Sequence, residues 1–244
     1  MSDPQGLAFD AVAEDYDRGR AGWPREVLDG VDAQTVLDLG AGTGKLTRLL
    51  VERYPEVYAV EPLAGMRAVL ARNVPEATVL PGDAERIPLD DGSVDAVFVA
   101  EAFHWFDSKA AALEIARVLR PNGVLVVTFN EWLSQYEPPI GDAAHSAIES
   151  RAARLPPAGA PKVQSGEWKR GFDGAPFTPL EERAIAHVDE TDREGVAAYY
   201  VSISSLAQLP PDERERLRAE LLAVIPDARY RLQLAARVFT TRRL

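Results

Sequence analysis

Short, strongly apolar runs alternate with helix-like segments through the first half of the chain. Five runs have the composition of β-strands: residues 35–39, 57–60, 78–80, 94–99 and 124–129. They are rich in valine and mostly lack the alternation of apolar and polar residues seen in half-exposed strands, so we expect each to be buried on both faces. Strands separated by helices in this order predict an α/β domain with a parallel sheet between two layers of helices.

The predicted topology also indicates where a functional site belongs. Right-handed crossovers between parallel strands place the carboxyl ends of all these strands on one edge of the sheet. In open α/β sheets, ligands bind at that edge. Residues that directly follow a strand are therefore the first candidates for a functional site.

The pattern changes between residues 131 and 180, where proline and glycine are frequent and only residues 142–153 have helical spacing. An irregular stretch of this length in a compact domain is usually functional or mobile. Regular patterns return with a strand over 183–190, helices beginning near Asp192 and Pro211, and a final strand over 229–241. We therefore predict a single domain. Its parts are an N-terminal helical cap (1–32), a core (33–130), an insert (131–180) and a C-terminal part of the sheet (181–244).

Charge and composition narrow the classes of partner. The chain has 38 acidic and 27 basic residues, a formal charge of −11, which disfavours nucleic acid as a partner. No apolar run approaches the ~18 residues of a membrane span, and the N-terminus lacks a signal-peptide core, so we expect a cytoplasmic protein without membrane contact. Cysteine is absent and no metal-ligand spacing is present, so no metal is expected. The oligomeric state stays open.

Three glycines at alternate positions, Gly40, Gly42 and Gly44, directly follow the first predicted strand. Glycine permits a sharp turn there and lets a ligand approach the main chain closely. Such a loop between a buried strand and an amphipathic helix is typical of a nucleotide-binding site, and several kinds of loop compete for this assignment.

Two phosphate-binding loops fit the sequence poorly. In a P-loop, Leu39 would occupy the position of the first glycine and Leu46 that of the Ser or Thr that binds magnesium, so this class is excluded. In a dinucleotide-binding fingerprint, Thr43 or Lys45 would occupy the position of the third glycine. That assignment is weakened but stays open.

Together with Asp38, the three glycines form an acid-x-Gly-x-Gly-x-Gly sequence that resembles the first motif of class I S-adenosylmethionine (AdoMet) methyltransferases. Further segments match the family in order, so that the resemblance covers residues 35–129. It implies a Rossmann-like methyltransferase fold, a doubly wound, seven-stranded and mostly parallel sheet closed by an antiparallel C-terminal hairpin. It also implies AdoMet as cofactor and S-adenosylhomocysteine as product, with the loop beneath the methionine part.

Glu61 ends the second predicted strand, where a carboxylate can accept hydrogen bonds from both hydroxyls of a ribose. NAD enzymes have an acidic residue at the same place, so Glu61 by itself fits either cofactor. The methyltransferase resemblance implies that Leu63 and Met66 form a wall beside the adenine. It also implies that Asp83, next to Ala84, accepts a hydrogen bond from the adenine amino group.

Residues 9–20 resemble the N-terminal segment of small-molecule methyltransferases related to trans-aconitate methyltransferase. This resemblance implies that Tyr16 and Arg20 close over the cofactor, with Arg20 near its carboxylate. An ordinary amphipathic helix that packs through Phe9, Val12 and Tyr16 explains the same pattern, and both interpretations stay open.

Residues 100–107, after the fourth predicted strand, contain three aromatic rings and a histidine. We assign Glu101 to the cofactor site, and Phe103 and Trp105 to the acceptor site, because aromatic faces can stabilise a sulfonium and shape a dry pocket. His104 is a candidate general base, or a hydrogen-bond partner of the acceptor, because histidine titrates near neutral pH. A purely structural hydrogen bond is the alternative.

The insert supplies further aromatic residues for an acceptor-binding lid. Trp132 and Tyr136 are assigned to the acceptor, and His145 and Trp168 fall in the same region. The sequence thus predicts an AdoMet-dependent methyltransferase that methylates an oxygen, nitrogen or carbon atom of a small-molecule acceptor. The alternatives are an NAD(P)-dependent oxidoreductase and a protein that binds AdoMet without catalysis.

Overall fold

The computed structural model describes residues 8–133, 140–155 and 165–244. Its strands are β1 (Thr35–Leu39), β2 (Glu56–Val60), β3 (Thr78–Leu80), β4 (Val94–Ala100), β5 (Leu119–Trp132), β6 (Glu181–Asp192) and β7 (Arg229–Arg242). In this part of the chain they form one seven-stranded sheet in the order β3-β2-β1-β4-β5-β7-β6. Strands β1 to β5 are parallel, and β7 runs antiparallel between β5 and β6. The predicted fold class is confirmed.

Strand β5 is longer at both ends than the sequence predicts. Leu119 pairs with Val94, and the register then shifts, so residues 120–123 lie inside the strand as an irregularity. At the other end, pairing with β7 continues as far as Trp132, opposite Leu234. Trp132 therefore extends the sheet.

The described helices are α2 (Ala13–Gly19), α3 (Thr47–Arg53), α4 (Ala64–Asn73), α5 (Ser108–Val118), α6 (Gly141–Ala152), α8 (Arg193–Val201) and α9 (Pro211–Val224), with short 3-10 turns between them. Buried side chains gather on both faces of the sheet, so the doubly wound arrangement has two core layers. Leu37 of β1 packs in the same cluster as Ile115 of α5, whereas the next residue along, Val36, packs in the cluster of Leu50 of α3.

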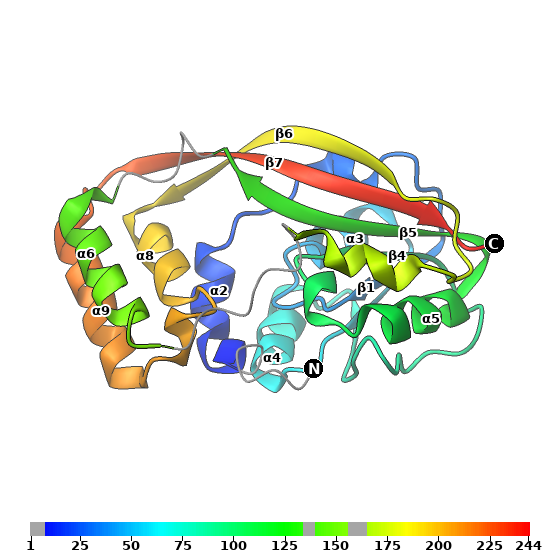
Figure 1. Cartoon of the computed structure of the whole chain (residues 1–244), viewed down its shortest axis with the longest axis horizontal. Helices are drawn as coiled ribbons and strands as arrows, with labels where there is room; N and C mark the ends of the chain where they lie inside the picture. The colour runs from blue at the N-terminus through cyan, green and yellow to red at the C-terminus, as the bar shows by residue number, and fades with distance from the viewer. Residues whose placement is uncertain (1–7, 134–139, 156–164) are drawn as a thin grey trace.

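The prediction that Trp168 belongs to a lid is wrong. Its side chain is only 1% exposed and lies in the core, with ring centroids 5.4 Å from Phe129 and 5.0 Å from Phe239. The 3-10 helix that carries it, Glu167–Phe172, packs against α5 (Figure 1). Burial of such a large apolar ring favours folding, so this part of the insert stabilises the sheet.

Helices α6, α8 and α9 form a helical layer at the end of the molecule opposite the C-terminus (Figure 1). They share a separate apolar cluster that includes Ile148, Val196 and Leu217. Helix α2 lies beside α8, although the two are far apart in the sequence (Figure 1). In the described part of the chain no helix is long and apolar enough to span a membrane.

Candidate active site

The glycine loop leaves β1 at the edge of the sheet where the parallel strands end. The N–H groups of Gly40 and Ala41 donate to the carbonyl oxygen of Val60, at 2.8 and 3.2 Å. Gly40 and Gly42 have φ values of +71° and +57°, which favour glycine. A Cβ at Gly40 would lie 2.6 Å from the Cβ of Ala102, so only glycine fits this close approach.

A cavity of about 460 Å³ opens beside the loop. The predicted cofactor residues that line it are Tyr16, Arg20, Gly40, Gly42, Glu61, Leu63, Met66, Asp83, Ala84 and Glu101. His104 and Trp105, predicted for the acceptor, also line it. Residues from five separate segments of the sequence thus lie around one cavity.

A smaller cavity of about 240 Å³ adjoins the first, because the two share Tyr16, Arg20, Gly40, Gly42, Ala100, Glu101 and Tyr199 in their walls. Asp38 and Trp132 line only the smaller one. The two cavities are adjoining parts of one site at the carboxyl ends of β1, β2 and β4.

Two of the predicted site residues that the structure describes do not line either cavity. Gly44 packs against α4, where an added Cβ would lie 2.5 Å from Leu70 and 3.1 Å from Val74. Its role is close packing between the loop and a helix. Phe103 is fully buried, stacked on Phe172 with centroids 5.3 Å apart, so it belongs to the core. Its assignment to the acceptor is not supported.

Tyr136 lies outside the described residues. His145 lies on α6 and is exposed. His104 lies at the cavity wall in a short 3-10 turn, where its ring centroid is 5.0 Å from that of Trp105 and 5.8 Å from that of Phe129. His104 therefore lines the larger cavity in contact with neighbouring aromatic rings.

Glu61 is fixed at the cavity wall by the backbone. One of its carboxylate oxygens accepts from the N–H of Gly42 and the other from the N–H of Leu63, both at 2.9 Å. The side chain is 4% exposed, and burial raises its pKa. Each oxygen retains a lone pair, so two adjacent hydroxyl donors can bind to the same group.

Asp83 fits recognition of an adenine amino group. Its Oδ1 atom is buried and has no hydrogen-bond partner among the described residues. A buried acceptor without a donor is unfavourable, and a ligand amino group would satisfy it. Leu63 and Met66, which are almost fully buried, line the same cavity and provide an apolar surface for a flat ring.

Asp38 and Glu101 bring two further carboxyl groups to the smaller cavity. Asp38 accepts from the Thr47 hydroxyl at 2.6 Å through one oxygen, while its other oxygen is buried and unpartnered among the described residues. Glu101 has a left-handed φ of 52° and accepts from the N–H of Asn130 at 2.5 Å. Burial raises the pKa of each group to about 7.

Arg20 brings a cation to the same place. Its guanidinium lies between two rings, 4.9 Å from the centroid of Tyr16 and 5.0 Å from that of Tyr199. One Nη donates to the carbonyl of Ser202 at 3.2 Å, whereas Nε is buried and unpartnered among the described residues. Nε is therefore a donor suited to a ligand carboxylate.

One wall of the site consists of residues that no sequence motif indicates. Tyr199, near the end of α8, lines both cavities, and Ile203, Ser204 and Ser205 line the larger one. These residues follow Arg20 by more than 170 positions, and their pattern is that of an ordinary amphipathic helix. Only the packing of α8 against α2 brings them to the site. No group of three His, Asp or Glu side chains in the described part of the chain is arranged to hold a metal ion.

Residues 37–127 match a model of the methyltransferase domain family. An uncharacterized methyltransferase of Schizosaccharomyces pombe is 31% identical over 229 residues, which cover 90% of this chain and 88% of that protein. An uncharacterized methyltransferase of Mycobacterium tuberculosis is 51% identical over 127 residues, 51% of this chain and 52% of that protein.

Solved structures show the same fold. A proposed type II methyltransferase from Anaeromyxobacter dehalogenans has a TM-score of 0.63 at 23% identity, covering 91% of this chain and 97% of that one. A geranyl diphosphate methyltransferase in complex with AdoMet has a TM-score of 0.50 at 16% identity, covering 96% of this chain and 85% of that one.

The chain belongs to the class I AdoMet-dependent methyltransferases, enzymes whose methyl donor is AdoMet. This confirms the family predicted from the glycine loop and the segments after it. The match spans about half the length of the mycobacterial relative and most of the yeast one. The finer resemblance to the trans-aconitate methyltransferase group stays a prediction.

Proposed function

We propose that this chain transfers a methyl group from AdoMet to an oxygen, nitrogen or carbon atom of a small-molecule acceptor in the cytoplasm. The observation that carries the proposal is the buried Glu61 carboxylate, held by the backbone of Gly42 and Leu63 at the wall of a cavity large enough for a nucleoside. In that position it accepts hydrogen bonds from the two hydroxyls of a ribose.

The other polar groups of the site suit the remaining parts of the cofactor. Asp83 accepts from the adenine amino group, and the free Nε of Arg20 donates to the methionine carboxylate. Asp38 and Glu101 offer carboxyl groups to the cationic amino and sulfonium groups. These assignments use each unpartnered atom of these side chains, which supports AdoMet over NAD, because the adenosine of NAD carries an anionic pyrophosphate where AdoMet has its sulfonium and amino groups.

When bound, AdoMet would supply a methyl group whose carbon an acceptor atom attacks in line, while the bond to sulfur breaks and S-adenosylhomocysteine leaves. The task of the protein is therefore alignment of the reactants and exclusion of water, and alignment contributes roughly 7–11 kcal/mol in favourable cases. His104 and Trp105 line the larger cavity and Trp132 the smaller one. We assign these three to the acceptor, with His104 orienting it or removing its proton.

Calorimetric titration with S-adenosylhomocysteine tests the cofactor assignment. We expect the wild-type protein to bind this product and not NADH, and Glu61→Ala to weaken binding at least tenfold, since two charge-assisted hydrogen bonds are lost. Glu56→Ala is the matched control, because Glu56 is exposed at the opposite end of β2 and we expect its removal to leave affinity unchanged. Absence of binding by the wild type, or equal binding by Glu61→Ala, contradicts the proposal.

Transfer of a labelled methyl group from AdoMet to a panel of metabolites separates an enzyme from a protein that only binds AdoMet. With an acceptor in hand, His104→Ala is assayed at saturating AdoMet. Loss of general base catalysis lowers kcat about 10²- to 10⁴-fold. An unchanged kcat shows that His104 does not remove the proton.

A further inference from the structure

The connection between β3 and β4 carries Asp83 into the site but is otherwise outside it. Residues Gly82 to Glu85 line the larger cavity, and the following residues, 87–91, do not line it. The connection has almost no regular secondary structure, apart from an isolated bridge between Asp83 and Arg86. The contacts that hold residues 87–91 in place therefore also affect the position of Asp83.

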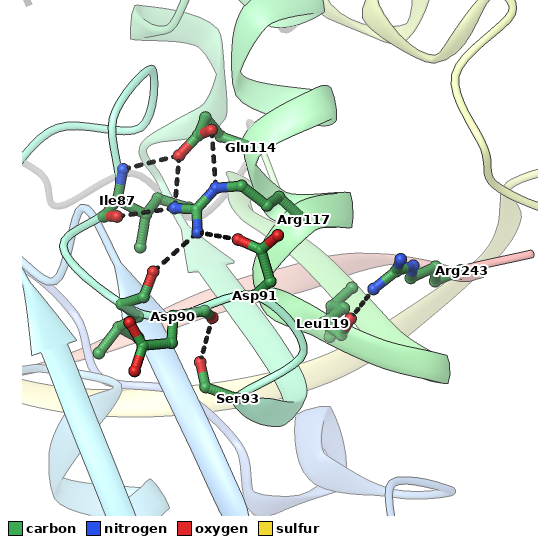
Figure 2. Close-up of polar contacts among 9 residues, drawn as sticks. Ile87, Asp90, Asp91, Ser93, Glu114, Arg117, Leu119 and Arg243 are labelled. Atoms are coloured by element: carbon green, nitrogen blue, oxygen red, sulfur yellow. Dashed lines mark hydrogen bonds and ion pairs between the residues drawn. The ribbon is translucent and has the colours of Figure 1, made fainter.

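Arg117 of α5 holds this segment with a complete set of hydrogen bonds (Figure 2). Its Nη2 donates to the carbonyl of Ile87 at 2.9 Å, and its Nη1 to the carbonyl of Leu89 and to Asp91, both at 2.8 Å. The remaining two donors, Nε and the second Nη2 proton, bind the carboxylate of Glu114 at 2.9 and 2.8 Å. All five N–H donors of the guanidinium are used.

Glu114 completes the contact with the loop. Its Oε2 atom accepts from the N–H of Ile87 at 3.1 Å, so the pair binds both the donor and the acceptor of one peptide residue (Figure 2). The backbone carbonyl of Arg117 also accepts from the N–H of Gly92 at 2.9 Å. A flexible lysine ammonium cannot reproduce this planar arrangement.

Packing transmits the position of residues 87–91 to Asp83. A Cβ at Gly82 would lie 2.8 Å from the Cδ of Pro88, so the two residues are in close contact. Ile87, 3% exposed, packs in the same core cluster as Ala84. Glu85, which lies between Asp83 and this segment in the sequence, accepts from the N–H of Asp107 at 2.8 Å. The residues next to Asp83 are thus fixed by two separate contacts, one with Pro88 and one with Asp107.

We propose that Arg117 and Glu114 are positioning residues for adenine recognition. By fixing residues 87–91 from outside the cavity, they hold the Oδ1 atom of Asp83 where it accepts from the adenine amino group. This inference rests on the proposed function, because it requires that the ligand be an adenine nucleoside. Neither Arg117 nor Glu114 lines the two cavities of the site.

The test compares two ligands that differ at one group. S-adenosylhomocysteine carries the amino group, and S-inosylhomocysteine has a carbonyl in its place, which Asp83 repels. We expect the wild type to prefer the adenosyl ligand about 10- to 100-fold, the range of a hydrogen bond to a charged group. In Arg117→Ala we expect this preference to fall below threefold, with most of the loss in adenosyl affinity. Arg117→Lys should lie between the two.

Arg151→Ala is the control, because Arg151 also binds a glutamate and a backbone carbonyl, but on α6. It should keep the full preference. An Arg117 variant that loses affinity for both ligands equally, or keeps the preference, overturns the inference. If Arg117→Ala does not fold, Arg117→Lys decides the question by the same ratio. If the wild type binds neither ligand, the proposed function fails first, so the two failures are distinguishable.

Discussion

Asp38 and Glu101 are carboxyl groups that burial keeps partly protonated at neutral pH. Burial raises the pKa of each to about 7, and their partners, Thr47 and Asn130, lower it only in part. Because the ordinary pKa of Asp38 is 3.8, the folded protein retains a proton that the unfolded chain loses between pH 4 and 7. The contribution of this proton to the free energy of unfolding is therefore complete below about pH 4 and decreases as the pH rises to 7.

A cationic ligand next to Asp38 and Glu101 favours their charged, deprotonated form. We expect AdoMet binding to lower both pKa values, so that protons are released at pH 6.5 and affinity increases as the pH rises through 7. Calorimetry in buffers of different ionisation enthalpy measures the number of protons released. Asp38→Asn keeps an acceptor for the Thr47 hydroxyl but not the charge, so it should release fewer protons. Release unchanged in this variant would contradict the assignment of Asp38 to the cofactor.

The glycines of the β1–α3 connection have different roles, and alanine substitutions distinguish these roles. Gly44→Ala places a Cβ against Leu70 at a φ of +88°, so we expect a loss of roughly 2–5 kcal/mol in the free energy of unfolding, measured in urea. Gly92→Ala, at a φ of +58° with open space around it, is the control for backbone strain and should cost about 1–2 kcal/mol. Equal losses in the two variants would contradict a packing role for Gly44.

Gly42→Ala completes this comparison within the same connection. The added Cβ would lie no closer than 4.0 Å to another residue, the Tyr16 ring. The free energy of unfolding of Gly42→Ala should therefore resemble that of Gly92→Ala. Because Gly42 lines both cavities, affinity for S-adenosylhomocysteine should fall in this variant and remain close to wild type in Gly92→Ala.

The elements that the sequence predicts best are those with a local cause. The buried strands, the β3 segment over residues 78–80 and the helix beginning at Pro211 follow from apolar runs and helix-start signals within a few residues. Glu61 and Asp83 were predictable because they follow strands whose ends share one edge. Trp168 was not predictable, since an isolated aromatic in an irregular segment fits a lid and a core equally well. Tyr199 was not predictable because its place depends on helix packing.

At the scale of the whole molecule, the site lies where the helical layer meets the sheet. Helix α2 packs against both α8 and α4, and Gly19 makes the close contact with α8 possible. A Cβ at Gly19 would lie 2.2 Å from the backbone nitrogen of Tyr199 and 2.5 Å from its Cα. The next residue along, Arg20, stacks on the Tyr199 ring, so the distance between the two helices also sets the shape of the cavity wall.

Gly19→Ala therefore tests whether the contact between α2 and α8 supports the site. Backbone atoms cannot move aside as a flexible side chain can, so α2 and α8 must separate, at a cost of about 1–3 kcal/mol in stability. We expect weaker binding of S-adenosylhomocysteine together with a lower urea midpoint. Gly22→Ala is the control in the same segment, because its Cβ would meet no atom within 4 Å. It should bind as the wild type does. If Gly19→Ala were to lose stability while keeping its full affinity, the wall formed by Arg20 and Tyr199 would have no part in binding the cofactor.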